Sequence, residues 1–148
     1  MKIVVVSDTH GDFYELKRVA MKENGANVFL HVGDSEAFEI QELSPFASVK
    51  GNCDYSLAKL PKDYYLETPY GMLYMRHYPL FSEDDIDELK EKNIKIFIHG
   101  HTHIKESKII DGIYILCPGS LTKPRDGSPS YMTLEISEAE VKVEFKTL

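Results

Sequence analysis

The sequence has few cysteines, no long apolar run and fewer basic than acidic residues. Its two cysteines, Cys53 and Cys117, could form one disulfide, but we expect free thiols because the chain reads as an intracellular protein. The apolar stretch at residues 3–6 is too short for a signal peptide, and no later segment approaches the roughly 20 apolar residues that span a bilayer. We therefore expect a soluble, cytoplasmic protein that does not enter a membrane.

The deficit of basic residues limits the class of binding partner. The formal net charge of −7 at pH 7 argues against a broad surface for duplex DNA or RNA, because phosphate backbones bind where lysine and arginine cluster. We expect no stable nucleic-acid partner, although an acidic protein can process phosphate compounds if cations mediate the contact. The 148 residues, 43% of them hydrophobic, are enough for one core, so we expect a single domain over residues 1–148.

The first half of the chain alternates β-branched runs with helical patterns. Residues 2–6, 27–32 and 46–50 are predicted strands. Residues 12–23 repeat apolar side chains at helical spacing, and residues 33–43 indicate a loop that enters a second helix. Strands that alternate with helices favour a largely parallel sheet.

The second half has a different pattern. Residues 64–77 predict a hairpin around PYG, residues 82–93 a helix capped by Ser82, and residues 95–99 a strand. Two further hairpin strands flank Asp111 and Gly112, and residues 131–136 and 141–148 supply two more strands. We expect this half to be mostly antiparallel, and the whole chain to form an α/β fold, α+β in part, with two sheets packed face to face and helices outside.

Residues that can bind metal ions follow five of the predicted strands. They are Asp8 and His10, Asp34, Asn52 and Asp54, His77, and the two histidines His101 and His103 of the stretch IHGHTH. Because the carboxyl ends of strands in α/β sheets converge on one crevice, we expect these side chains to meet there.

Each of these residues also has a purely structural interpretation. Asp8 and Asp12 could cap a helix, and Asp34 and Asn52 could be turn residues. A lone His77 could be a packed or surface histidine. We interpret His31, inside a strand, and His99, just before Gly100, as packing residues. The joint occurrence at strand ends favours a metal centre over independent turns.

The same segments resemble the motifs of the calcineurin-like metallophosphoesterases. The resemblance is carried by SDTHGD at 7–12, Gly33-Asp34, GNCD at 51–54, His77, GHTH at 100–103 and PGS at 118–120. The short length and the segment PRDGSPSYMTLEI are similar to the small bacterial and archaeal phosphodiesterases of that superfamily. The resemblance covers residues 3 to about 136 and implies a four-layer αββα sandwich of two packed mixed β-sheets flanked by helices.

The resemblance implies a centre of two divalent transition-metal ions. One ion would be bound by Asp8, His10, Asp34 and His103, and the other by Asp34, Asn52, His77 and His101. It also places His10, Asn52, Asp54 and His77 among the catalytic residues. Manganese is the expected metal, with Ni, Fe, Co and Zn as alternatives, since oxygen and nitrogen ligands without thiolate suit such ions. The expected reaction is hydrolysis of a small phosphodiester by in-line attack of a hydroxide that bridges both metals.

Two departures from the family pattern leave details open. Tyr78 and Pro79 follow His77 where many relatives carry HGH, and Cys53 stands where larger phosphatases of the superfamily have a proton-donating histidine. His10 or a metal-bound water could then protonate the leaving group. The alternative function is a catalytically weak or inactive scaffold that binds other proteins, as in the retromer subunit that this fold resembles. If the chain self-associates, a homodimer is the oligomer that we expect.

Overall fold

The computed structural model describes residues 1–148 as ten strands, two α-helices and one short 3₁₀ helix. In chain order they are β1 (Lys2–Val6), α1 (Phe13–Lys22), β2 (Val28–His31), η1 (Ile40–Leu43), β3 (Ala47–Ser48), β4 (Asp63–Thr68), β5 (Gly71–Arg76), α2 (Glu83–Glu91), β6 (Ile94–Ile98), β7 (Lys105–Ile110), β8 (Ile113–Pro118), β9 (Tyr131–Ile136) and β10 (Val141–Lys146). No helix is both long and apolar enough to cross a membrane.

The strands form two five-stranded sheets. Sheet A has the order β10-β9-β1-β2-β3, with β1, β2 and β3 parallel and β9 and β10 antiparallel to their neighbours. Sheet B has the order β4-β5-β6-β8-β7. The two hairpins β4-β5 and β7-β8 are antiparallel as expected, but β6 runs parallel to both β5 and β8 in the middle of sheet B. Both sheets are therefore mixed.

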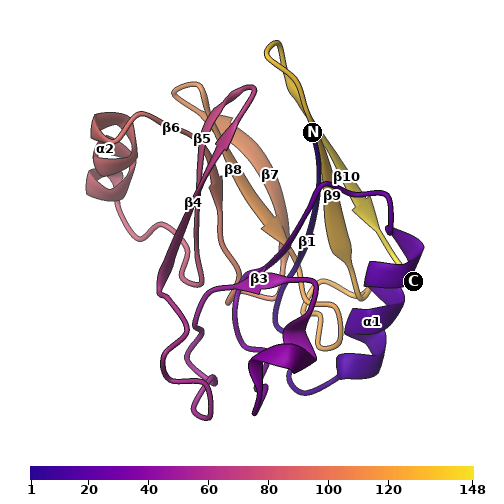
Figure 1. The fold of residues 1–148 in the computed structure, drawn as a ribbon. Coiled ribbons are helices and arrows are strands. Elements are labelled where there is room, and N and C mark those ends of the chain that lie inside the picture. Colours follow the sequence, from indigo (N-terminus) through magenta and orange to yellow (C-terminus); the bar gives the residue numbers. More distant parts are fainter.

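The sheets pack face to face and the helices cover their outer faces, so the molecule has four layers. Figure 1 shows α1 and α2 on opposite sides of the pair of sheets. The side chains of β1 alternate between two cores: Ile3 and Val5 point into the core between the sheets, and Val4 and Val6 pack with Leu16 of α1. A third cluster packs Leu89 of α2 against the outer face of sheet B. The predicted αββα sandwich is confirmed.

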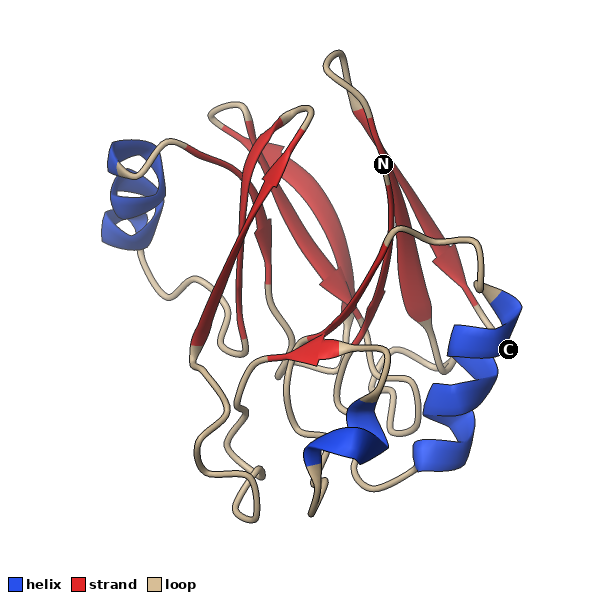
Figure 2. Ribbon diagram, viewed as in Figure 1, coloured by secondary structure: helices blue, strands red, loops and turns tan.

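Two predicted elements of the first half are shorter than expected. The helix expected within residues 33–43 is reduced to the single 3₁₀ turn η1, and the strand expected at 46–50 is reduced to β3 (Figure 2). Asp34 and Glu36 have positive φ angles of 61° and 59°, which a helix cannot include. Pro45 directly follows Ser44, and the residue before a proline disfavours helical angles. This segment is instead shaped by contacts with the neighbouring loops.

Candidate metal centre

Five loops bring the predicted ligands to one edge of the two sheets. Asp8 and His10 follow β1, Asp34 follows β2, Asn52 follows β3, His77 follows β5, and His101 and His103 follow β6. Two groups have potential ligand atoms within 4.8 Å of one another: Asp8, His10 and His103 in one, and Asp34, His77 and His101 in the other. A third group, His10, Asp34 and Cys53, overlaps both. Asp12, the other residue considered for helix capping, does cap α1, because its carboxylate accepts from the Glu15 N–H at 3.1 Å.

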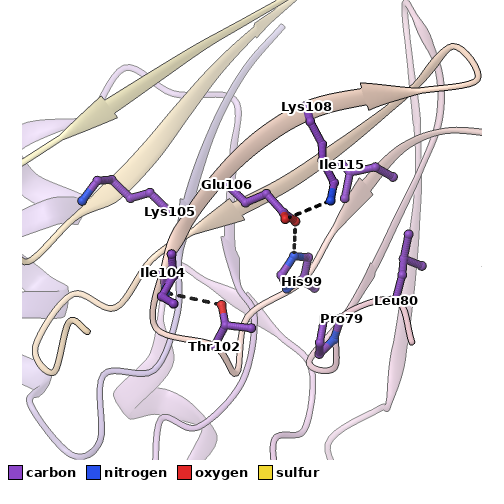
Figure 3. Close-up of a pocket in the computed structure, with 9 residues that line it drawn as sticks. All are labelled: Pro79, Leu80, His99, Thr102, Ile104, Lys105, Glu106, Lys108 and Ile115. Atoms are coloured by element: carbon purple, nitrogen blue, oxygen red, sulfur yellow. Dashed lines mark hydrogen bonds and ion pairs between the residues drawn. The ribbon is translucent and has the colours of Figure 1, made fainter. Parts of the chain in front are cut away.

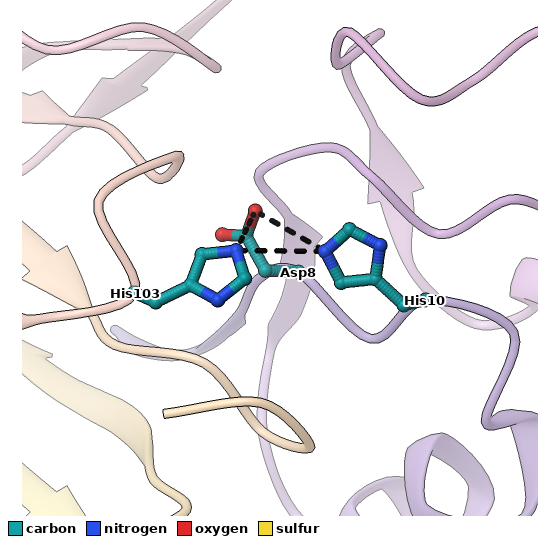
Figure 4. A group of neighbouring side chains, drawn as sticks. All are labelled: Asp8, His10 and His103. Atoms are coloured by element: carbon teal, nitrogen blue, oxygen red, sulfur yellow. Dashed lines mark hydrogen bonds and ion pairs between the residues drawn. The ribbon is translucent and has the colours of Figure 1, made fainter. Parts of the chain in front are cut away.

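The carboxylate of Asp8 lies at the centre of the first group, as Figure 4 shows. Its Oδ2 accepts a hydrogen bond from the backbone N–H of His101 at 3.2 Å. Its Oδ1 is buried and has no hydrogen-bond partner. Instead, Oδ1 faces the Nε2 atoms of three imidazoles, at 3.2 Å from His103 and at 4.0 Å from His10 and from His77. A buried, unpaired carboxylate oxygen is costly, and a cation among these four atoms would satisfy it.

The second group surrounds Asp34 and Asn52. Nε2 of His77 is 3.3 Å from Asp34 Oδ2 and 3.0 Å from Asn52 Oδ1, and Nδ1 of His101 is 3.2 Å from the same amide oxygen. Burial raises the pKa of Asp34, but hydrogen bonds from His77 and from the Cys53 N–H outweigh it, so the pKa lies below its usual value. Asp34 is therefore an anion, and this group presents carboxylate, amide and imidazole donors to one point.

The contacts on the far side of three imidazoles fix which ring nitrogen faces the centre. Nδ1 of His10 donates to Glu36 Oε2 at 2.9 Å, Nδ1 of His77 to the carbonyl of Val32 at 2.7 Å, and Nδ1 of His103 to the carbonyl of Lys123 at 2.6 Å. Each ring thus carries a proton on Nδ1 and points Nε2 inward. This is the arrangement that metal-binding histidines use. Without a metal, Nε2 of His77 donates to Asp34, and burial, which lowers the pKa of His77, is outweighed by its contacts with Asp34 and Asp8, so that pKa lies above its usual value. A cation between Nε2 and these oxygens would take the place of that proton.

The backbone at the ligands is strained. The φ angles are 53° at Asp8, 43° at His10, 61° at Asp34, 69° at His101 and 61° at His103. Residues other than glycine in this region cost on the order of 1 kcal/mol or more each, and such strain concentrates at functional sites. Hydrogen bonds between loops hold the conformation: Asp8 N–H donates to the Gly33 carbonyl at 3.0 Å, and His10 N–H donates to the Asp34 carbonyl at 2.9 Å.

The loops also approach one another too closely for side chains at some positions. A Cβ atom on Gly51 would lie 2.6 Å from the backbone nitrogen of Asp34 and would collide with its carboxylate. Glycine is therefore required directly before Asn52, so that the loops after β2 and β3 can bring their ligands together.

Asp54 does not point into the cluster. Its buried carboxylate accepts four hydrogen bonds: from the N–H groups of Asp34 (2.9 Å), Gly51 (2.7 Å) and Glu36 (2.9 Å), and from Ser35 Oγ (3.3 Å). These contacts tie the loop after β2 to the loop after β3. Because both oxygens are fully used by the scaffold, Asp54 has the geometry of a positioning residue rather than the catalytic one that the family pattern suggested.

The two histidines interpreted as packing residues lie outside the cluster. His31 is fully buried, accepts from the Gly33 N–H at Nδ1 (3.0 Å) and contacts Thr9 Oγ1 at Nε2 (2.9 Å). Burial lowers the pKa of His31 to about 4, so the ring is neutral. His99 contacts Glu106 at 2.8 Å and lines a separate cavity of about 200 Å³ (Figure 3).

Other side chains at the edge of the centre have scaffold roles. Cys53 and Cys117 are both free, as expected. Burial raises the pKa of the Cys53 thiol, which disfavours the thiolate that metals bind. Ser120 is buried, and its hydroxyl donates to the Asp8 carbonyl at 2.8 Å. The sequence reasoning missed Glu36, which orients His10; its position two residues after a predicted ligand was the one available signal.

The chain is similar in sequence and in structure to known phosphoesterases. The calcineurin-like phosphoesterase superfamily domain matches residues 1–139. A probable metallophosphoesterase, YsnB of Bacillus subtilis, is 29% identical, over 96% of this chain and 89% of its own length. The phosphodiesterase YfcE of Escherichia coli is 24% identical, over 88% of this chain and 84% of its own length. A crystal structure of a predicted phosphoesterase from Streptococcus pneumoniae superposes with a TM-score of 0.86 at 29% identity, and the match covers 99% of this chain and 88% of that one. The chain belongs to the calcineurin-like phosphoesterase superfamily.

Proposed function

We propose that this protein hydrolyses small phosphodiesters at a dinuclear centre of divalent transition-metal ions. The observation that carries the proposal is the buried Asp8 Oδ1, which has no hydrogen-bond partner and faces three imidazole Nε2 atoms. A superfamily defined by phosphoester chemistry, together with a relative named a phosphodiesterase, supports the reaction class.

Two overlapping ligand sets are proposed. The first is Asp8, His10, Asp34 and His103, and the second is Asp34, Asn52, His77 and His101. Asp34 is assigned to both because its carboxylate oxygens lie within 4.8 Å of ligand atoms from either side, His10 on one and His77 and His101 on the other.

The donor chemistry fits borderline divalent ions. Imidazole nitrogens, carboxylates and one amide oxygen suit Mn, Fe, Co, Ni or Zn, and the family resemblance favours manganese. Bound ions of this kind lower the pKa of water and neutralise charge on phosphoryl oxygens. Only two carboxylates, Asp8 and Asp34, belong to the proposed sets, so two divalent ions would leave an excess of positive charge there. An anionic ester is then attracted locally, although the whole chain is acidic.

The protein groups also limit the choice of leaving group. His10 donates through Nδ1 to Glu36 and turns Nε2 to the cluster, so neither nitrogen is free to act as a proton donor. The Asp54 carboxylate is used by four hydrogen bonds. We therefore propose esters whose leaving groups have a low pKa, such as aryl phosphodiesters, as the preferred class, because they depart without a proton from a protein side chain.

The test is metal-dependent turnover of bis(4-nitrophenyl) phosphate. Protein stripped with a chelator should regain activity with Mn or Ni but not with Ca, which prefers six to eight oxygen ligands. Asp34→Asn should reduce kcat/KM by at least about 100-fold, because loss of groups that merely support a ligand already costs 10- to 100-fold. Asp87→Asn makes the same chemical change on the exposed face of α2 and should leave activity unchanged.

Inactivity with every transition metal would refute the proposal and favour the alternative of a protein-binding scaffold. Equal losses in the Asp34→Asn and Asp87→Asn variants would show that the site is elsewhere.

A further inference from the structure

A large cavity opens directly beside the second ligand set. It has a volume of about 620 Å³ and is lined by the loop between β3 and β4 and by the end of β5. Asn52 and His77, both proposed ligands, form one side of it. The cavity is about three times the volume of the one at His99 and is large enough for an organic group that is attached to a phosphate at the metals.

Two lysines of the cavity wall form no ion pair with any carboxylate of the protein. Lys50 and Lys62 both line the cavity, and neither forms an ion pair. The carboxylates of the lining are already hydrogen-bonded: Asp54 by the four donors described above, and Asp63 by the hydroxyl of Tyr74. In a chain with a net charge of −7, two unpaired lysines at one cavity favour an anionic ligand.

The cavity also presents an aromatic surface next to the metal ligands. The ring of Tyr78 packs against His77 at 5.2 Å between centroids and against His101 at 5.1 Å. These contacts hold the ring in place, yet 39% of Tyr78 is exposed. Tyr55, which also lines the cavity, is 80% exposed. Exposed tyrosines of this kind offer a flat apolar face on which an aromatic group can pack.

We infer that this cavity binds the organic arm of the substrate: an aromatic group that packs on Tyr78 and carries a second negative charge near Lys50 and Lys62. The inference rests on the proposed function, because the phosphodiester itself is assigned to the neighbouring metal centre. It narrows the substrate class to diesters with an aromatic, anionic ester arm, and it assigns Lys50, Lys62 and Tyr78 as specificity-determining residues.

Two diesters with a common leaving group test the preference. Phenyl 4-nitrophenyl phosphate and 4-carboxyphenyl 4-nitrophenyl phosphate both release 4-nitrophenolate, and they differ only in the charge of the retained arm. We expect kcat/KM to be about fivefold higher for the carboxylated diester, because two exposed ion pairs with the lysines contribute an effect of about this size. The preference should shrink at high salt, because salt screens exposed charges. It should disappear in the Lys50→Ala/Lys62→Ala double variant.

Lys59→Ala is the matched control. Lys59 lies on the same loop, is exposed and also forms no ion pair, but it does not line the cavity. The Lys59→Ala variant removes one positive charge from the same segment and should retain the preference for the carboxylated diester. Tyr78→Ala should weaken the binding of both aryl diesters and should leave their ratio unchanged.

Equilibrium binding gives a readout that does not depend on turnover. Phenyl methylphosphonate and its 4-carboxyphenyl analogue would be titrated into the protein by calorimetry, with manganese and with chelator. The carboxylated probe should bind about fivefold tighter to wild type and to Lys59→Ala, but not to the double variant. Equal affinities in wild type, or a preference that survives in the double variant, would overturn the inference. A binding preference without turnover of either diester would refute the proposed function alone.

Discussion

Replacement of Asp8 by asparagine distinguishes two effects on stability. One is the destabilisation that the unpaired carboxylate causes in the metal-free protein, and the other is the stabilisation that metal binding provides. The amide oxygen can still accept from the His101 N–H at the position of Oδ2, and the amide NH₂ would replace Oδ1, which lies 3.2 Å from Nε2 of His103. The unpaired buried carboxylate oxygen is removed and a new donor meets the imidazole lone pair. We therefore expect Asp8→Asn to stabilise the metal-free protein, by about 1–3 kcal/mol.

The same substitution should remove the stabilisation that comes from the ion of the first ligand set, and it should leave the second set, which does not include Asp8, intact. An ion at 100 times its Kd stabilises the folded state by about 2.7 kcal/mol, and for a domain of this size each kcal/mol shifts Tm by about 2–4 °C. Each manganese ion should therefore raise the Tm of wild type by roughly 5–11 °C.

Thermal unfolding followed by circular dichroism, in chelator and in manganese, measures both effects. Asp8→Asn should show a higher Tm than wild type in chelator and a smaller shift with manganese than wild type, and Asp87→Asn should behave like wild type in both. The reasoning is wrong if Asp8→Asn keeps the full manganese shift, or if it unfolds well below wild type in chelator.

Three further predictions concern the scaffold and the departures from the family pattern. Asp54→Asn should lower the free energy of unfolding by about 2 kcal/mol and weaken manganese binding, because the loops after β2 and β3 lose a shared hydrogen-bond acceptor. An unchanged free energy of unfolding in urea would contradict this prediction. Burial raises the pKa of Glu23, but hydrogen bonds from Tyr131, Lys2 and Lys146 outweigh it and lower the pKa to about 2 from 4.5. Stability of about 3 kcal/mol should therefore be present above pH 4.5 and be lost as pH falls toward 2, whereas Glu23→Gln should lack this dependence in denaturation at pH 7 and pH 3. Pro79→His should shift the ratio of diester to monoester turnover by about tenfold, since a hydrogen bond to a charged group contributes roughly 1.5 kcal/mol or more; an unchanged ratio would make the proline incidental.

Much of the fold could be predicted because local pattern and tertiary packing agree. The alternation of Ile3, Val4, Val5 and Val6 between two cores requires a strand that is buried on both faces, and the β-branched run indicates such a strand. The sequence also predicts the β6 strand, but it does not predict which strands lie beside β6 in the sheet. Its parallel pairing with β8 depends on the chain returning past β7, and no local signal encodes that order.

The segment after β2 could not be predicted because long-range contacts determine its conformation. Its pattern suggests a helix, but Asp54 binds the N–H groups of Asp34 and Glu36 and holds both in the left-handed region. The loop geometry therefore depends on a carboxylate about 20 residues further along the chain. Local propensity cannot report such a contact.

The candidate site was predictable to the level of its residues but not of its supports. Strand ends placed all seven proposed ligands, and the structure brings their donor atoms together. The acceptors that orient the imidazoles are mostly backbone carbonyls, those of Val32 and Lys123, and any residue type supplies a carbonyl. The assignment of the ligands to two ions, the single domain and the homodimer stay predictions.

The number of manganese ions bound per chain tests the central claim most directly. Protein saturated with manganese, freed of unbound metal and measured by elemental analysis should contain two ions per chain, and Asp34→Asn should contain one or none. A crystal of the same sample should show both ions by anomalous scattering beside Asp34. Less than one ion per chain in wild type, or a count unchanged by Asp34→Asn, would contradict the dinuclear centre.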